Sequence, residues 1–325
     1  MKIIKRNIVD RSSEIGEIKS FLNANFSTIF HEPEFNQIVE KNFRTRCYYL
    51  CAYNDNGKLV ALCPCHSKKN GFTIFTQSNP TKFEIPYGGW VYDREETRIK
   101  ELMSAMQPAA NEGIVYWSMP QIEHDDYSEM EKKNRFQTAV IDLDQSEDDI
   151  WNNSINSKRR NMIRKAEKNK VTVEMIDHAR FGEYYNMMIE TYGAAELMLK
   201  PIEYYVNVLK TYIGANKASV FLAKVGANFV SGLVALRNKF ACHYWLGASR
   251  KNVDNLGQGE LLQWAAIKWA KENRSRFYDL CVLEPERLPN IARFKSGFSD
   301  RVVPFYCISK KGAGYRLLNR LAGDR

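Results

Sequence analysis

The sequence predicts an α/β (α+β) protein made of two similar domains, over residues 1–150 and 151–325. Each half of the 325-residue chain carries a β-hairpin pattern that is followed by a strand, a loop, a helix and another strand. An acidic run at Asp142–Asp149 separates the two halves. A unit that occurs twice argues for two domains rather than one long sheet.

In the first half, apolar alternation over Tyr48–Cys65 is interrupted by Asn54-Asp55-Asn56-Gly57. A turn ending in Asn-Gly between two alternating runs is a strong hairpin signal. We expect the following elements after it: strands near 72–76 and 88–92, a helix over Arg94–Asn111 and a strand at Ile114–Met119.

The second half repeats this order, beginning with a hairpin over Val220–Leu236 that turns near Gly226-Ala227-Asn228. The elements expected after it are a strand, a loop, a helix and a strand, at Ala241–Leu246, 247–259, about Glu260–Asn273 and Arg276–Leu283.

Charge is distributed unevenly. Residues 1–150 carry 18 Lys/Arg and 23 Asp/Glu, a net of −5, whereas residues 151–325 carry 29 and 15, a net of +14. Seven of the fourteen residues of Ser157–Lys170 are Lys or Arg, in a predicted helix that Asn156-Ser157 can cap. The run is either a solvated basic face or a surface for an anionic ligand. Aromatic-rich helices are expected after it, at Phe181–Tyr192 and Ile202–Ile213.

Several classes of protein are disfavoured by what the sequence lacks. No apolar run reaches the roughly 20 residues of a membrane span, and the N-terminus does not resemble a signal peptide, so we expect a cytoplasmic protein. The seven cysteines and five histidines show no metal-ligand spacing, so no metal site is expected. Serine-hydrolase order, paired carboxylates and a Walker loop are also missing, which favours direct transfer between two bound substrates.

Three segments of the second half are candidates for chemistry. The loop Asp254–Gly259 has glycines that let a ligand approach the backbone at the start of a helix. In Ala292–Phe298, the ammonium of Lys295 beside Phe294 suits an oxyanion or a phosphate. The hydroxyl of Tyr244 either donates to a leaving group or points into the core. Each segment also has an ordinary structural interpretation as a turn or a core position.

At these residues the chain resembles the FemAB family of peptidoglycan-bridge aminoacyltransferases and related acyltransferases. The resemblance covers most of the chain and rests on four segments: TIFHEPEFNQIVEK (28–41), KRRNMIRKAEKNKVTVE (158–174), GELLQWAAIKWAKENRSRFYDL (259–280) and ARFKSGF (292–298). It implies two GNAT-like domains, each a mixed, mostly antiparallel sheet flanked by helices. It also implies transfer of an acyl or aminoacyl group to an amine, on a cell-envelope or polysaccharide precursor.

The resemblance also implies roles for individual residues. Lys295 and Tyr244 match catalytic positions, and Phe294, in the same Phe-Lys element as Lys295, is implied to bind the donor or precursor. Donor or precursor binding is implied for the remaining candidates: Arg293, Lys158, Arg159, Arg160, Asn255, Gly257, Gly259 and, by a loose match, Asp93. No tightly bound cofactor is expected; the donor, aminoacyl-tRNA or acyl-CoA, is a co-substrate, and the acceptor is a UDP- or lipid-linked precursor.

Some positions depart from the family. Asp254 stands where coenzyme A-dependent GNAT enzymes commonly carry Arg or Gln, and an anion there would repel pyrophosphate. Asp279-Leu280-Cys281-Val282 stands where the family often has Asp-Leu-Gly-Gly, and Ser299-Asp300 replaces a Gly-Gly pair.

Two other functions stay open at this point. The +14 half with its interleaved aromatics suits a non-catalytic module that binds nucleic acid, such as tRNA. The tail Lys310–Arg325 places Leu317, Leu318 and Leu321 among basic residues, a pattern for weak contact with a membrane surface or for a helix packed on the domain.

Overall fold

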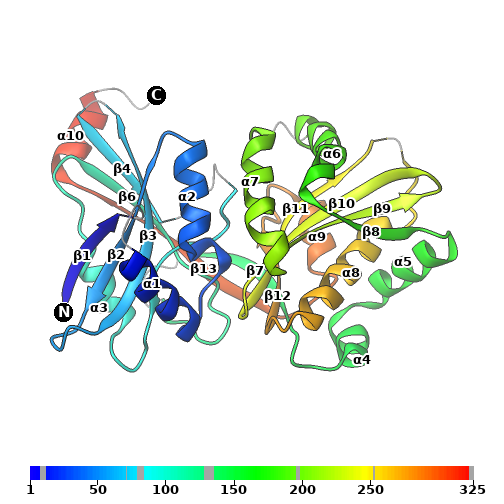
Figure 1. Cartoon of the computed structure of the whole chain (residues 1–325), viewed down its shortest axis with the longest axis horizontal. Helices are drawn as coiled ribbons and strands as arrows, with labels where there is room; N and C mark the ends of the chain where they lie inside the picture. Colours follow the sequence, from blue (N-terminus) through cyan, green and yellow to red (C-terminus); the bar gives the residue numbers. More distant parts are fainter. Residues whose placement is uncertain are drawn as a thin grey trace. The chain divides into compact units, whose positions relative to one another are not determined.

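The structure, a computed structural model, describes residues 1–7, 12–70, 72–78, 84–127, 135–194, 198–251 and 253–321 (Figure 1). It divides into two compact units: unit 1 is Met1–Phe136 with Pro304–Arg325, and unit 2 is Gln137–Val303. This division differs from the predicted boundary at residue 150. The reason is that β7 (Arg135–Asp142) pairs within unit 2, whereas β13 (Val302–Lys311) pairs with β6 (Glu112–Trp117) of unit 1.

Unit 1 is built on one mixed sheet, whose strand order is β1-β2-β3-β4-β6-β13, with β5 also paired to β3. Among the described strands of this unit, β4 and β6 run parallel and the other pairs are antiparallel. The bounds not yet given are β1 (Lys2–Asn7), β2 (Arg46–Tyr53), β3 (Leu59–Asn70), β4 (Thr73–Gln77) and β5 (Val91–Tyr92). Its helices are α1 (Ser12–Ala24), α2 (Pro33–Asn42), α3 (Ile99–Ala105) and α10 (Ala313–Leu321).

Local chemistry explains one success and one error in unit 1. The predicted hairpin is confirmed: the Asn54 side chain accepts from the amides of Asn56 and Lys58, and Gly57 takes φ +76°, which favours glycine. The helix predicted over Arg94–Asn111 is wrong in extent, since α3 spans only Ile99–Ala105. The chain turns first at Asp93, and Pro108 disfavours a helical residue before it.

Unit 2 repeats this arrangement, with the strand order β7-β12-β11-β10-β9-β8. Here β11 and β12 form the single parallel pair. The strands are β8 (Thr172–Ile176), β9 (Ala218–Val225), β10 (Asn228–Arg237), β11 (Ala241–Ser249) and β12 (Phe277–Leu283). The helices are α4 (Glu147–Asp149), α5 (Ser157–Lys168), α6 (Phe181–Ala194), α7 (Ile202–Tyr212), α8 (Gln258–Glu272) and α9 (Pro289–Lys295), with a π-helical turn at Ile150–Ser154.

The two faces of the unit 2 sheet are covered differently. On one face, Phe221 and Leu233 join α5 and α8 in an apolar cluster, with Trp269 of α8 in edge contact with Phe221. On the other face, Gly232 lies against Tyr184 of α6, and the rings of α7 pack on Trp245. The sheet is therefore held between helices, as the sequence predicted, and the predicted fold class is confirmed. In unit 1 the corresponding cluster is centred on β2, β3 and α3.

The C-terminal segment packs on unit 1. The Lys310 ammonium donates to the carbonyls of Met103 and Met106, at the end of α3, and Tyr315 covers Gly113. This favours the packed helix over a membrane-contacting tail, although Leu317 is exposed. The side chains of Leu318 and Leu321 lie outside the described residues. Within the part of the chain described, none of the helices has the length and apolar character that a membrane crossing requires.

Candidate active site in unit 2

The strands β11 and β12 separate in the middle of the unit 2 sheet. They pair only from Ala241–His243 to Phe277–Asp279, although β11 continues to Ser249 and β12 to Leu283. A register shift opposite Val234 and Ala235 gives β11 one extra residue, and such a bulge bends a strand away from its neighbour. Side chains from neighbouring elements therefore meet the unpaired edges of both strands.

A buried hydrogen-bond network fixes the point of divergence. His243 Nδ1 lies 2.8 Å from Asp279 Oδ2, while Asp279 Oδ1 accepts from the Thr138 hydroxyl at 2.5 Å and from the Cys281 amide at 2.9 Å. His243, Asp279 and Cys281 offer three potential metal-ligand atoms within 4.8 Å of one another. Since protein donors already bond to both carboxylate oxygens, the arrangement suits a structural network. Sequence reasoning missed it because the three residues come from two strands and show no motif.

Lys295, the last residue of α9, lies at the opening between the strands. Its ammonium donates to the Val282 carbonyl at 2.9 Å and lies 5.6 Å from the centre of the Tyr244 ring. Burial lowers the pKa of Lys295, and electrostatic interactions with Cys281 and Asp279 oppose this effect. The structure thus brings together the two residues that were predicted to be catalytic.

The Tyr244 side chain lies close to the backbone of its own strand, β11, at Gly247. Burial raises the pKa of its phenol to about 12, so the hydroxyl keeps its proton at neutral pH. A β-carbon at Gly247 would stand 1.9 Å from the Tyr244 hydroxyl oxygen. Glycine at 247 is therefore required for the ring to fold back along β11.

We expect Gly247→Ala to displace the Tyr244 ring, because backbone and phenol cannot both keep their positions. If Tyr244 serves the reaction, turnover falls while the unfolding midpoint changes little, since residue 247 is half-buried at the unpaired edge. Gly214→Ala is the matched control, because a β-carbon there meets no atom within 4 Å. Equal turnover of the two variants would contradict a role for the Tyr244 position.

The basic helix α5 is less available to ligands than its sequence suggests. Asn156 caps it by accepting from the Arg159 amide. Arg159 is buried and donates to Glu260 of α8 at 2.6 Å and to the Arg293 carbonyl at 3.1 Å, and its guanidinium lies 4.9 Å from the Phe294 ring centre. It therefore links α5, α8 and α9, which is a structural role where we had predicted phosphate binding.

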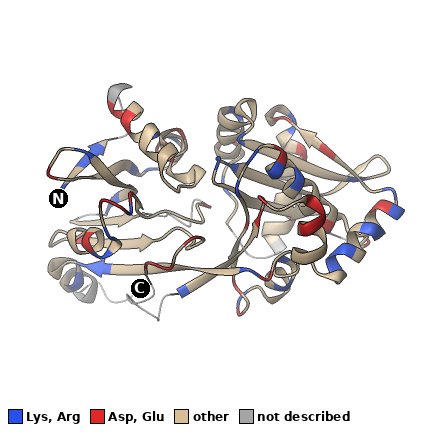
Figure 2. Ribbon diagram, turned by 90° about the horizontal axis from the view of Figure 1, so that it is seen from below, with Lys and Arg blue, Asp and Glu red and all other residues tan. Residues whose placement is uncertain are grey.

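Arg160 and Lys158, on either side of Arg159 in the sequence, have different surroundings. Arg160 donates to the carbonyls of Trp151, Asn152 and Ile155, and so closes the π-helical turn. Lys158 is exposed and has no ion pair among the described residues. Of the predicted 158–160 cluster, Lys158 is exposed, Arg160 is half-buried and Arg159 is buried; Figure 2 shows the basic bands along α5.

The two glycines of the loop Asp254–Gly259 pack against neighbouring helices. Gly257 has φ +87°, and a β-carbon there would stand 2.0 Å from the Met162 carbonyl of α5, whereas Gly259 lies against the Phe294 ring. The Gly257 amide donates to the Asn255 side chain at 3.2 Å, and the Leu256 amide donates to Gln258 at 2.8 Å. The loop thus packs against α5 and α9, and two of its amides donate to side chains within the loop.

Comparison with known proteins relates this geometry to a family model. Residues 154–296 match the model of the acetyltransferase (GNAT) domain. Unit 2 matches this model over most of its length. The divergence of β11 and β12, the glycine loop and α8 all lie within the matched residues.

Solved structures extend the comparison to the whole chain. The crystal structure of FemX matches with a TM-score of 0.70 at 13% identity and covers 99% of each chain. L-PGS from Bacillus licheniformis matches at 0.53 and 14% identity, covering 97% of this chain and 98% of its own. A tandem GNAT protein from the clavulanic acid pathway matches at 0.53 and 9% identity, covering 95% and 98%. The chain thus has a FemX-like tandem GNAT fold, as the sequence resemblance implied. No curated protein matches it.

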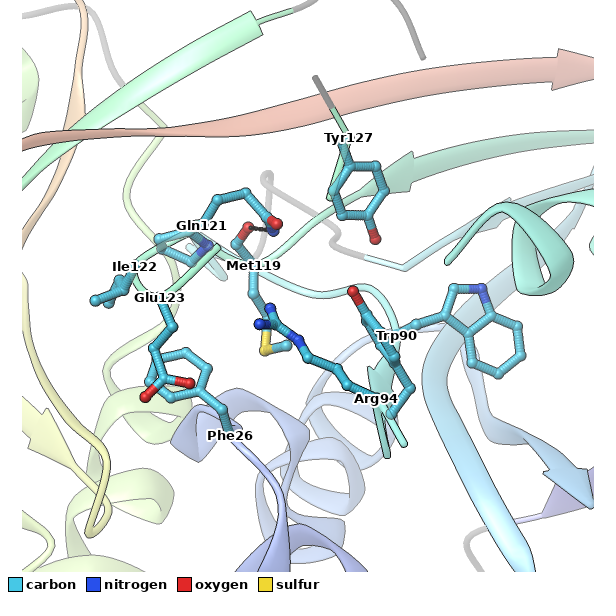
Figure 3. Close-up of a pocket in the computed structure, with 10 residues that line it drawn as sticks. Phe26, Trp90, Arg94, Met119, Gln121, Ile122, Glu123 and Tyr127 are labelled. Carbon is cyan, nitrogen blue, oxygen red and sulfur yellow. Dashed lines mark hydrogen bonds between the residues drawn. The ribbon is translucent and has the colours of Figure 1, made fainter. Parts of the chain in front are cut away.

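In unit 1, β5 and the segment that follows β6 come together. A cavity of about 30 Å³ lies there, lined by Trp90, Arg94, Met119 and Tyr127 among others (Figure 3). Arg94 forms an ion pair with Asp126 at 3.0 Å. The volume suits a single water-sized group, so this cavity is too small for an acyl donor.

Asp93, the candidate outside the GNAT domain, belongs to unit 1. Its carboxylate accepts from the Glu95 amide at 3.0 Å and from the Lys58 ammonium at 3.3 Å. These bonds shape the turn that precedes α3. They explain the acidic residue at this position without a ligand.

Proposed function

We propose that the protein is an acyltransferase that moves an acyl or aminoacyl group from an activated donor to an amine on a cell-envelope or polysaccharide precursor. The observation that carries this proposal is the pair Lys295 and Tyr244 at the opening between β11 and β12. One residue offers a positive charge and the other an acidic proton, which are the two groups that direct acyl transfer requires.

The reaction follows from these two groups. The acceptor amine attacks the carbonyl carbon of the donor, a C–N bond forms, and the carbonyl π electrons move onto oxygen. The Lys295 ammonium stabilises that oxyanion. When the intermediate collapses, the bond to the carrier breaks and the Tyr244 phenol protonates the departing oxygen or sulfur. The proton released from the amine nitrogen passes through solvent and restores Tyr244.

The glycine loop favours aminoacyl-tRNA over acyl-CoA as the donor. The amides of Leu256 and Gly257 already donate to side chains of the loop. Asp254 adds negative charge just before the start of α8, where a pyrophosphate would bind. Because Glu260 is neutralised by Arg159, the site holds an internal ion pair near that helix start.

A non-catalytic module that binds nucleic acid is the weaker alternative. Arg159, Arg160 and Lys165 donate to protein groups instead of standing free for phosphates. A guanidinium that is paired with a carboxylate, as Arg159 is with Glu260, releases no counterion when a nucleic acid binds.

A donor panel tests the proposal. The purified chain is incubated with amine-bearing envelope precursors and either acetyl-CoA or a mixture of aminoacyl-tRNAs, with deacylated tRNA as the control, and acylated product is measured. We expect product from aminoacyl-tRNA at a rate at least tenfold above that from acetyl-CoA. A higher rate with acetyl-CoA would reverse the donor assignment, and binding of tRNA without product from any donor would support the alternative.

A further inference from the structure

A large groove on unit 1 carries strong positive charge although the first half of the chain is net negative. Its volume is about 950 Å³, and it is bounded by the end of α2, the starts of β2 and β4, the end of β3, and parts of β1 and β6. Six cationic side chains line it: Lys5, Lys41, Arg44, Arg46, Lys68 and Lys69. The sequence had directed attention to the second half, so this surface comes from the fold alone.

Among the described residues, these six cations are not paired with carboxylates, although Glu40 and Glu112 also line the groove. The two carboxylates that line the groove are bonded to neutral donors: Glu112 accepts from the Thr76 hydroxyl at 2.6 Å, and Glu40 accepts from the Cys47 amide at 3.3 Å. Like charges gathered on one surface repel one another, so an anion in the groove would stabilise the unit.

The register of the sheet explains why distant residues meet here. Arg46 pairs with Ser67, Lys69 pairs with Ile74, and Ile74 pairs with Glu112, so these positions lie on one face of the sheet. Tyr48 follows on the same face and is buried, with the Lys5 ammonium 3.6 Å above the centre of its ring. The groove therefore has an aromatic floor and cationic walls.

The arrangement of the cations indicates the size of the ligand. They approach one space from β1, from the α2–β2 connection and from the end of β3. A nucleic-acid backbone is met by cations spread along a track, whereas these six line a single groove. The volume lies within the range of small-molecule sites. Arginine forks can bind phosphate oxygens in pairs, and lysines add point charges.

We propose that this groove is a binding site for a compact ligand with two or three linked phosphate groups, such as a pyrophosphate or a nucleoside diphosphate. The site belongs to unit 1 and does not rest on the acyl transfer proposed for unit 2. Its ligand is recognised by phosphate oxygens, with Tyr48 beneath them.

Calorimetric titration of the full chain with pyrophosphate at low salt tests the site. We expect pyrophosphate to bind at least tenfold more tightly than orthophosphate, because linked phosphates engage more of the cations. Arg44→Glu/Lys69→Glu should raise the pyrophosphate Kd at least tenfold. The matched control is Lys210→Glu/Lys251→Glu, which changes the net charge equally at exposed positions outside the groove; it should change the Kd less than twofold.

Three results would overturn the proposal. One is the absence of pyrophosphate binding at millimolar concentration by the folded wild-type chain. Another is equal weakening by both double variants, which would mean a general charge effect. The third is tight, groove-dependent binding of a single-stranded RNA that pyrophosphate cannot displace, which would assign the groove to nucleic acid.

Discussion

Replacement of Lys295 by alanine is expected to lower the rate of acyl transfer by roughly 10²–10³-fold, the usual effect of removing an oxyanion-stabilising group. The fold should persist, because the half-buried side chain contributes one hydrogen bond, to the Val282 carbonyl. Single-turnover rates with saturating donor measure the loss, and Lys251→Ala at an exposed site is the control. Unchanged turnover in the alanine variant would refute the role of Lys295.

The pH profile gives a second measure of the same residue. Because burial lowers the Lys295 pKa below 10.5, its ammonium is lost at lower pH than in the unfolded chain. The rate of transfer should therefore decline as the pH rises toward 10.5. Over the same pH range the contribution of Lys295 to the free energy of unfolding should increase, because the unfolded chain binds this proton more tightly than the folded one. Lys295→Arg removes that alkaline decline, since guanidinium stays protonated. A decline that persists in the arginine variant would assign it to another group.

Asp279→Ala is expected to have the largest effect on stability, about 3–5 kcal/mol, as for a buried charged group whose partners lose their bonds. It removes the acceptor for His243, the Thr138 hydroxyl and the Cys281 amide at the point where β11 and β12 separate. Urea unfolding followed by circular dichroism measures the loss in the transition of unit 2.

The exposed Asp300→Ala provides the matched control for this measurement. Asp279→Asn should lie between alanine and the wild type, because the amide keeps one acceptor oxygen. A loss below about 1 kcal/mol in the alanine variant, the size of a single ordinary hydrogen bond, would mean that the network does not hold the strands together.

The local elements could be predicted because their causes are local. The Asn54–Gly57 turn and the Asn156 cap lie within a few residues of the bonds they make. The helix Arg94–Asn111 was overextended because an Asp93 turn and Pro108 compete with helical periodicity. The order of the strands in the sheet could not be predicted, since no local signal in the sequence reveals that β13 pairs with β6.

The candidate site could be predicted only in part. Lys295 and Tyr244 were found through a resemblance, and the fold brings them to one opening. A run of basic residues does not reveal which charges are internally paired, so the Arg159–Glu260 bond, across 101 residues, was not foreseen. The groove of unit 1 was hidden for the opposite reason, because its cations are scattered among acidic residues in the sequence.

The path of β13 has a consequence for how the protein is made. Unit 1 needs this strand beside β6, yet β13 is encoded after every other described strand. On the ribosome, the GNAT domain can fold as soon as its own strands have emerged, because domains form as units during translation. Until β13 has been synthesised, the edge of β6 lacks its neighbouring strand and is exposed to pairing with other nascent chains.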